Sequence, residues 1–246
     1  MLNIIIPMAG HGSRFKEAGF NDDKPMIKIF NVTMIENVLN NLQTNLSCKF
    51  IIICDIKLLN KYSKKLYSIK RKYNLEIVFI NKKTEGAACT ILHARKYINN
   101  NNELVLANCD QIIDIKLDNF IKDARKRKLD GSILTFIDKY KSNKWSFAKV
   151  NRNNIVTEVA EKKVISKYAT VGIYYFKRGY KFVNSAIDMI INNDRHNNEF
   201  YTCPVYNYLI KNNKVGIFNI PQNNMHGIGT PDDLKKYVDY RSNLNA

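Results

Sequence analysis

The chain lacks long apolar runs and paired cysteines, and both absences narrow what it can be. No apolar stretch in its 246 residues approaches the roughly 18–20 residues that a helix needs to cross a bilayer. The first residues, MLNIIIPM, lack the basic leader, long apolar run and cleavage site of a signal peptide. The five cysteines are scattered and include no CxxC pair, which argues against a disulfide framework and a zinc site. We therefore expect a cytoplasmic protein without a membrane span.

Acidic residues are scarce relative to basic ones. Lys and Arg number 39 against 22 Asp and Glu, which gives a formal net charge of +17. An excess of this size is typical of nucleic-acid-binding proteins, but these lysines are dispersed along the whole chain. The one dense cluster, KDARKRK at 122–128, is explained by a solvated helix face. We predict no nucleic-acid partner, and the charge equally suits a protein that handles polyanionic small molecules.

Short apolar runs alternate with helical patterns along the chain. They predict strands at 2–8, 49–54, 75–80, 103–108, 132–137, 146–151, 154–161, 170–176 and 214–220. The alternation in the first half predicts right-handed crossovers and a mostly parallel sheet. The later strands follow one another too closely for helices between most of them, which predicts a small antiparallel extension. We expect one α/β domain over 1–246.

Apolar residues at helical spacing, together with capping residues, predict several helices. One, TMIENVLNNL, begins with a capping box of Thr33 and Glu36. Others are predicted over about 85–97 and 117–129. The last begins in TPDDL, where Thr230 is the N-cap residue and acidic residues fill the first turn.

A glycine-rich turn, MAGHGSRF at 8–15, follows the first predicted strand. Open α/β sheets bind ligands at the carboxyl ends of their strands, so this turn is in a ligand-binding place. It is not a dinucleotide-binding fingerprint, because Phe15 replaces the third glycine and no acid ends a second strand at the required spacing. It is not a P-loop either, because the Gly-Lys-Ser/Thr sequence is absent.

The pattern that remains is G-x-G-x-R, followed by Lys-Pro in DKPM. Gly10 and Gly12 allow backbone N–H groups to approach an anion closely. Arg14 offers a planar fork for two phosphate oxygens, and Lys24 is a mobile point charge. Two cations and a nest of amides predict a triphosphate site; the alternative is that both cations are ordinary surface charges.

Together with five further segments, this turn resembles the sugar nucleotidyltransferases, also called nucleotide-sugar pyrophosphorylases. The segments follow in the order TEGAACTIL, LANCDQ, VAEKKVISKYATVGIYYF, NEFYTCPVYN and MHGIGTPDDL. The combination most resembles the branch associated with bacterial capsule and surface-polysaccharide synthesis. The resemblance implies a Rossmann-like three-layer α/β/α fold. It also implies transfer of a nucleoside monophosphate from a nucleoside triphosphate to a sugar 1-phosphate, or a similar phosphorylated polyol, with release of pyrophosphate.

The resemblance further implies roles for individual residues. The nucleotide would be held by Met8, Ala9, Gly10, Gly12, Ser13, Glu85, Gly86 and Ala87. Arg14 would contact the β- and γ-phosphates and Lys24 the α-phosphate, which makes these two the expected catalytic residues. Displacement at phosphorus is catalysed mostly by positioning and charge neutralisation, so no protein nucleophile is expected. Tight helix packing is the alternative explanation for the small residues at 86–87.

Asp110 ends a predicted buried strand and is the expected ligand of Mg²⁺, which prefers hard oxygen donors. A turn or cap role is the alternative. Asn108 breaks the D-x-D pair that related glycosyltransferases often use, which makes sugar transfer the weaker enzymatic hypothesis. The second carboxylate of the family is replaced by Gly227 in MHGIGT. The candidates to compensate for it are His226, Asp232 or a water molecule in the coordination shell.

The acceptor is expected to lie against the later segments of the resemblance. Glu161 would hydrogen-bond its hydroxyls, Lys162 would pair with its phosphate, and the remaining contacts would come from Thr170, Gly172 and Glu199. An exposed strand end is the alternative for the Glu-Lys pair. The motifs specify neither the base nor the acceptor, and they leave a homo-oligomer open. A basic scaffold or nucleic-acid binder is the non-enzymatic alternative.

Overall fold

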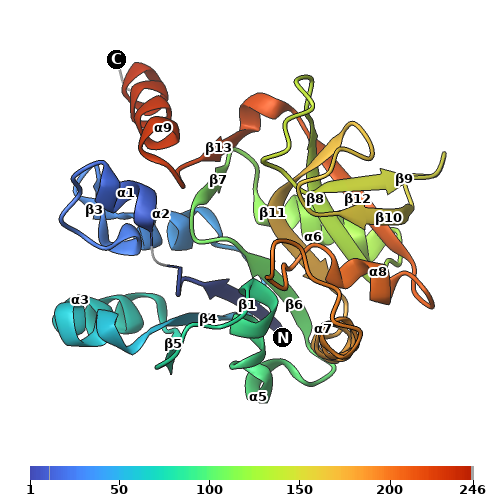
Figure 1. The fold of residues 1–246 in the computed structure, drawn as a ribbon, viewed down its shortest axis with the longest axis horizontal. Helices are drawn as coiled ribbons and strands as arrows, with labels where there is room; N and C mark the ends of the chain where they lie inside the picture. The colour runs from blue at the N-terminus through green and yellow to red at the C-terminus, as the bar shows by residue number, and fades with distance from the viewer. Residues whose placement is uncertain (11, 245–246) are drawn as a thin grey trace.

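A computed structural model describes residues 1–10 and 12–244. Four parallel strands form one part of a mixed nine-stranded sheet, in the order β5, β4, β1, β6 (Figure 1). Their bounds are β1 (Leu2–Pro7), β4 (Cys48–Asp55), β5 (Glu76–Ile80) and β6 (Glu103–Ala107). Strand β1 is almost continuously apolar because both faces of the sheet are covered. Ile4 and Ile6 enter the core on one face, and Ile5 enters the core on the other.

The remaining strands extend this sheet. Strand β11 pairs antiparallel with β6, β8 and β9, while β10 pairs antiparallel with β9 and β12 runs parallel to β8. Their bounds are β8 (Gly131–Ile137), β9 (Phe147–Val150), β10 (Val156–Ala160), β11 (Tyr168–Phe176) and β12 (Val215–Ile220). All nine predicted strands are present within two residues of their expected ends. The predicted mixed α/β sheet with an antiparallel extension is confirmed.

The sequence analysis did not predict two small antiparallel β-ribbons. They pair β2 (Lys28–Ile29) with β3 (Val32–Thr33), and β7 (Gln111–Ile113) with β13 (Met225–Gly227). Strands of two or three residues are too short to show an alternating pattern. The β7–β13 ribbon matters for the site, because it brings the segment before α9 (Pro231–Leu244) beside the end of β6 (Figure 1).

Helices cover both faces of the sheet, as expected for three layers. The core that contains Ile4 also receives side chains from α2 (Met34–Asn41), α3 (Ile56–Tyr73), α6 (Leu117–Lys126) and α9. The core on the opposite face receives side chains from α4 (Ala87–Leu92), α5 (Arg95–Ile98), α7 (Gly179–Ile191) and α8 (Val205–Leu209). No helix within the described ranges is long and apolar enough to cross a membrane.

Two predicted helices differ from the observed ones. The helix expected over 85–97 is two short helices, α4 and α5, with Ala94 non-helical between them. The helix expected over 117–129 ends at Lys126, because Lys128 adopts a left-handed conformation with φ of 52°. The expected start of the last helix is confirmed, since the hydroxyl of Thr230 accepts a hydrogen bond from the amide of Asp233 at 3.1 Å.

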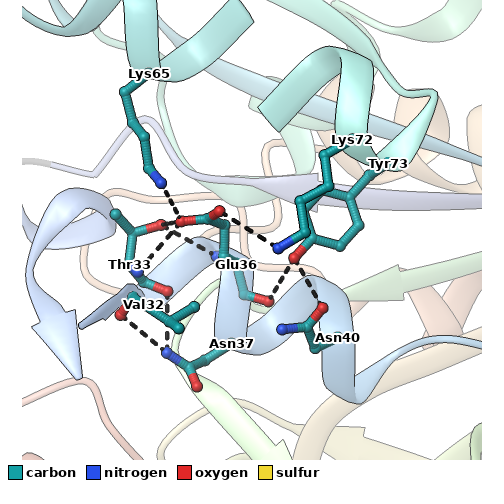
Figure 2. A network of polar contacts seen from close by, with 8 residues as sticks. All are labelled: Val32, Thr33, Glu36, Asn37, Asn40, Lys65, Lys72 and Tyr73. Carbon is teal, nitrogen blue, oxygen red and sulfur yellow. Dashed lines mark hydrogen bonds and ion pairs between the residues drawn. The ribbon is translucent and has the colours of Figure 1, made fainter. Parts of the chain in front are cut away.

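A polar network joins α2 to α3 (Figure 2). The predicted capping box is present: the Thr33 hydroxyl accepts from the Glu36 amide, and the Glu36 carboxylate accepts from the Thr33 amide. The same buried carboxylate pairs with Lys65 at 2.6 Å and Lys72 at 3.8 Å on α3. Burial acts to raise the pKa of Glu36, but the contacts with Lys65 and Thr33 outweigh it and lower the pKa.

Candidate active site

A cavity of about 340 Å³ opens at the carboxyl ends of β1 and β6. Parallel strands end at the same edge of a sheet, which is why segments distant in sequence meet there. The predicted residues that line it are Ala9, Gly10, Gly86, Ala87, Asp110 and Glu199. It is completed by Pro7, Lys83, Thr84, Thr90, Asn108 and Cys109.

The two glycines of the first turn differ in their backbone conformation and surroundings. Gly12 has φ of 59°, and a Cβ added there would lie 2.8 Å from the Cβ of Lys24. Gly12 is therefore required by the backbone and by the close approach of Lys24. At Gly10 an added Cβ would meet nothing within 4 Å, so the fold itself does not require a glycine there. Gly10 lines the cavity.

Lys24 and Asp110 form an ion pair, although 86 residues separate them in sequence. Lys24 Nζ donates to Asp110 Oδ2 at 2.5 Å, and the two side chains are only 17% and 23% exposed. Burial lowers the pKa of Lys24, but attraction to Asp110 outweighs it and leaves the pKa raised. The exposed Arg14, at the start of α1 (Ser13–Glu17), is close enough to act in the opposite direction. The structure thus brings Lys24 and Asp110 together, whereas Arg14 does not line the cavity.

The segment after β13 lies directly against Asp110. The Ile228 amide donates to the Asp110 carbonyl at 2.8 Å, and a Cβ added at Gly229 would lie 2.5 Å from Asp110 Oδ2. This contact explains why the chain uses glycine at 229, because any side chain would displace the carboxylate.

The two candidates for a second metal ligand have other surroundings. His226 Nε2 lies 2.7 Å from Asp114 Oδ2, and its ring stacks on Tyr240 with the ring centres 4.4 Å apart. Asp232 is exposed in the first turn of α9. A side chain at Gly227 would point toward Asp233, whose carboxylate lies 3.7 Å from the position of an added Cβ. Across residues 1–10 and 12–244, no three His, Cys, Asp or Glu side chains gather as a metal cluster.

The segment expected to receive the nucleoside is bound to a distant loop. The Phe200 amide donates to the Glu85 carbonyl at 2.7 Å, and the Ala88 amide donates to the Phe200 carbonyl at 3.0 Å. Gly86 has φ of 124°, and an added Cβ would lie 2.4 Å from the Phe200 carbonyl oxygen. Gly86 is therefore required by the close approach of the Phe200 backbone, not by the helix packing raised as the alternative, and it lines the cavity as well.

Glu85 does not line this cavity. Its carboxylate pairs with Arg195 at 2.5 Å and lies in a neighbouring cavity of about 560 Å³. Of the other predicted nucleotide-binding residues, Met8 buries its side chain in the core, and its amide donates to the Ile53 carbonyl at 2.8 Å. Ser13 is exposed at the first position of α1.

The residues predicted to bind the acceptor form a second polar group. Glu161 at the end of β10 is buried and accepts a hydrogen bond from the hydroxyl of Ser146. Burial raises the pKa of Glu161, while Ser146, Lys162 and His196 act to lower it. Lys162 has φ of 51° and donates to the Tyr201 hydroxyl at 2.8 Å.

Thr170 and Gly172 lie on β11, beside this group. The hydroxyls of Thr170 and Tyr174 are 3.1 Å apart, and the Thr170 amide donates to the Ser146 carbonyl at 2.8 Å. The space above Gly172 is filled, because an added Cβ would lie 2.1 Å from Gln111 Oε1 and 2.4 Å from Asn108 Nδ2. This glycine makes room for two side chains of the protein itself.

Glu199 adjoins both the first cavity and the residues predicted to bind the acceptor. It lines the first cavity, and its charge acts on both Glu161 and Tyr201. The sequence analysis did not single out Lys83, Thr84 or Ser146. Thr84 is the first residue of TEGAACTIL and Lys83 directly precedes it, and their polarity near a glycine was a usable signal. Ser146 had no such signal, because its role depends on the partner that the fold supplies.

Comparisons with known proteins identify a matching family and similar folds. A family model described as Nucleotidyl transferase matches residues 3–237. The bifunctional protein GlmU of Methanococcus aeolicus is 25% identical over 192 residues. That match covers 77% of this chain but only 42% of the relative, so the chain spans less than half of that protein's length.

Solved structures share the fold. The nucleoside-diphosphate-sugar pyrophosphorylase of Vibrio cholerae RC9 has a TM-score of 0.79 at 23% identity, with 96% of this chain and 99% of that one covered. A UDP-glucose pyrophosphorylase complexed with UDP-glucose has a TM-score of 0.78 at 15% identity, with 99% of both chains covered. At these identities the likeness establishes the fold.

Proposed function

The chain belongs to the nucleotidyl transferase family, and from this premise we propose its reaction. It transfers a nucleoside monophosphate from a nucleoside triphosphate to a sugar 1-phosphate, or to a similar phosphorylated polyol, and releases pyrophosphate. The observation that carries the proposal is the Lys24–Asp110 ion pair, which lies beside Gly10 at the carboxyl ends of β1 and β6. The printed names of the Vibrio cholerae pyrophosphorylase and of UDP-glucose pyrophosphorylase support a sugar-phosphate acceptor.

The reaction needs positioning and charge neutralisation more than acid–base chemistry. An oxygen of the acceptor phosphate attacks the α-phosphorus, and the bond from that phosphorus to the bridging oxygen breaks. The bridging oxygen keeps the electron pair and leaves with pyrophosphate, so no protein group has to accept a proton. Lys24 neutralises charge at the α-phosphate, Arg14 binds the β- and γ-phosphates, and the Gly10–Gly12 turn offers backbone amides.

The donor set around Asp110 fits Mg²⁺. This ion commonly binds to proteins through one or two carboxylates and completes its coordination with substrate phosphates and water. Asp110 supplies one carboxylate at the cavity wall, and its contact with the Lys24 ammonium shows that a cation can reach it. When bound there, Mg²⁺ would neutralise phosphate charge and orient the triphosphate.

The acceptor is assigned to the polar group around Glu161. The Glu161 carboxylate accepts hydrogen bonds from acceptor hydroxyls, as it does from Ser146, and Lys162 pairs with the acceptor phosphate. Thr170 and Glu199 complete this side. The sites connect through Glu199, which would place acceptor and triphosphate next to each other.

A role in capsule or other surface-polysaccharide synthesis, in the cytoplasm, belongs to the same proposal. The role is supported by the full-length resemblance to that branch of the family. The location is supported by the five cysteines, all of which are free within the part of the chain that the structure describes.

The proposal is tested by incubating the protein with Mg²⁺, each of the four common nucleoside triphosphates and a panel of sugar and polyol phosphates. Pyrophosphate release that requires both substrates supports it, and Asp110→Asn should abolish that release. A nucleotide-sugar-dependent glycosyltransferase would release no pyrophosphate under any of these conditions. A basic nucleic-acid binder would instead bind DNA or RNA in a salt-sensitive manner, with no preference for a triphosphate.

A further inference from the structure

A second cavity, of about 210 Å³, is lined in part by the glycine-rich turn. It shares Ala9 and Gly10 with the first cavity. Its other lining residues are Met8, Lys16, Asp23, Lys24, Pro25, Asp55, Lys57, Leu58 and Lys61. Lys24 joins the two spaces, because it lines the second cavity while its ammonium contacts Asp110 in the wall of the first.

Four lysines from three segments face this space, against two carboxylates. Asp23 holds two of them, with Lys61 at 3.1 Å and Lys16 at 3.7 Å. The other carboxylate, Asp55, is engaged as the N-cap of α3, where it accepts from the Lys57 amide at 2.8 Å. Among the residues described, the ammonium of Lys57 has no carboxylate within 4.0 Å. The cavity therefore carries an excess of positive charge.

We propose that this cavity receives the pyrophosphate leaving group, and that Lys57 and Lys61 of α3 bind it. The inference rests on the proposed function. In an in-line displacement the leaving group departs on the side opposite the attacking oxygen. The proposed acceptor residue Glu199 lines the first cavity but not the second, and the second cavity adjoins the first at Ala9 and Gly10.

Gly10 lines both cavities and has no side chain that could narrow either of them. Pyrophosphate gains an electron pair on its bridging oxygen when the bond to the α-phosphorus breaks. Lys57 and Lys61 place two further cations along its path, beyond Arg14 and Lys24. Asp23 keeps Lys61 and Lys16 at the cavity before the product forms.

The test is calorimetric titration of the full chain with inorganic pyrophosphate, and separately with nucleoside monophosphates, in the presence of Mg²⁺. The variant Lys57→Ala/Lys61→Ala is compared with the wild type and with Lys64→Ala, an exposed lysine of the same helix that does not line the cavity. We expect the double variant to weaken pyrophosphate binding at least tenfold and monophosphate binding less than twofold. Lys64→Ala should bind both ligands like the wild type.

The outcomes separate this inference from the proposed function. Undiminished pyrophosphate binding by the double variant overturns the inference alone. An equal loss in Lys64→Ala also overturns it, because the effect would then be general electrostatic attraction. A wild-type protein that binds neither triphosphates nor pyrophosphate overturns the inference and the proposed function together. Thermal unfolding of each variant shows whether a loss reflects misfolding.

Discussion

At the scale of single residues, neighbouring positions of one motif have separate physical causes. Gly12 is needed by the backbone, with φ of 59° and Lys24 against its Cα, whereas Gly10 faces empty space. Lys24 and Asp110 neutralise each other across 86 residues of sequence. A motif therefore mixes residues that build the site with residues that leave room for a ligand, and mutation separates the two kinds.

Gly10→Ala and Gly12→Ala should impair different properties, ligand binding in the first and stability in the second. Gly10→Ala leaves the thermal unfolding midpoint unchanged, but its methyl group occupies the space where phosphate would approach, so triphosphate affinity falls about tenfold, or about 1.4 kcal/mol. Gly12→Ala lowers the free energy of unfolding by more than about 1 kcal/mol, because alanine is strained at positive φ. Calorimetric titration and denaturant unfolding measure the two effects. A destabilised Gly10→Ala protein would show that this glycine is structural.

Lys24→Ala should reduce turnover far more than nucleotide binding. A cation directed at the α-phosphate acts mainly on charge that develops in the transition state, so kcat should fall about 100-fold or more. The Kd for the triphosphate should rise less than about fivefold. Pyrophosphate release and direct titration give the two values. If both change equally, Lys24 contributes only ground-state binding.

Lys162→Met should specifically impair use of the phosphorylated acceptor. Methionine keeps much of the length of the side chain but removes its charge, so the KM for the acceptor should rise about tenfold or more while the KM for the triphosphate stays constant. Tyr201→Phe is the matched control, since it removes the hydroxyl that Lys162 contacts and keeps the ammonium. Unchanged acceptor kinetics in Lys162→Met would remove Lys162 from the site.

At the scale of secondary-structure elements, short connections position the chemistry. The β7–β13 ribbon holds Ile228 and Gly229 against Asp110, and α3 reaches the DKPM segment through Lys61, which contacts Asp23. Helix α3 is in turn fixed to α2 by the network around Glu36 (Figure 2). The Glu36 carboxylate at its centre is buried, so removing one partner should cost more stability than breaking an exposed ion pair.

Glu36→Gln should destabilise the protein at neutral pH. The pKa of Glu36 is lower in the folded protein than in the unfolded chain, so its contribution is present above about pH 4.3 and disappears as the pH falls through the folded value. We expect a loss of about 1–3 kcal/mol at pH 7. The gap between variant and wild type should close on acidification, as followed by urea unfolding at several pH values. Glu76→Gln, at a more exposed ion pair, is the control and should lose less.

At the scale of the whole molecule, the sheet gathers segments from the entire chain around one edge. The first cavity draws on residues from Pro7 to Glu199, and the segment at 228–229 contacts Asp110. A site of this kind exists only in the folded state, so its ligands should stabilise the whole protein.

The correct nucleoside triphosphate with Mg²⁺ should raise the thermal unfolding midpoint. At a concentration of about 100 times Kd it adds about 2.7 kcal/mol, which corresponds to about 5–10 °C for a chain of this size. A screen of the four common triphosphates identifies the base by the largest shift. Asp110→Asn should lose the Mg²⁺-dependent part of that shift. Equal shifts with unrelated polyanions would indicate unspecific attraction by the net charge of +17.

Much of this architecture was predictable, and the exceptions have physical reasons. Long apolar strands and the Thr33–Glu36 capping box depend on local patterns, and both are found as expected. Ala94, where the chain is not helical between α4 and α5, and the short β7–β13 ribbon depend on tertiary contacts. Gly172 was expected to make room for a ligand, but Asn108 and Gln111 fill that space. The single domain over 1–246 and the roles of the site residues stay predictions.

The sequence by itself determined the order of strands and helices and the chemical types present in the first turn. Those features follow from periodicity and from the conformational range of glycine, which act over a few residues. Only the tertiary structure decided that Lys24 contacts Asp110 and that His226 contacts Asp114. It also decided that two lysines of α3 line a cavity together with Gly10. Such pairings depend on which strand ends and helix ends the sheet brings together, and no local sequence pattern predicts them.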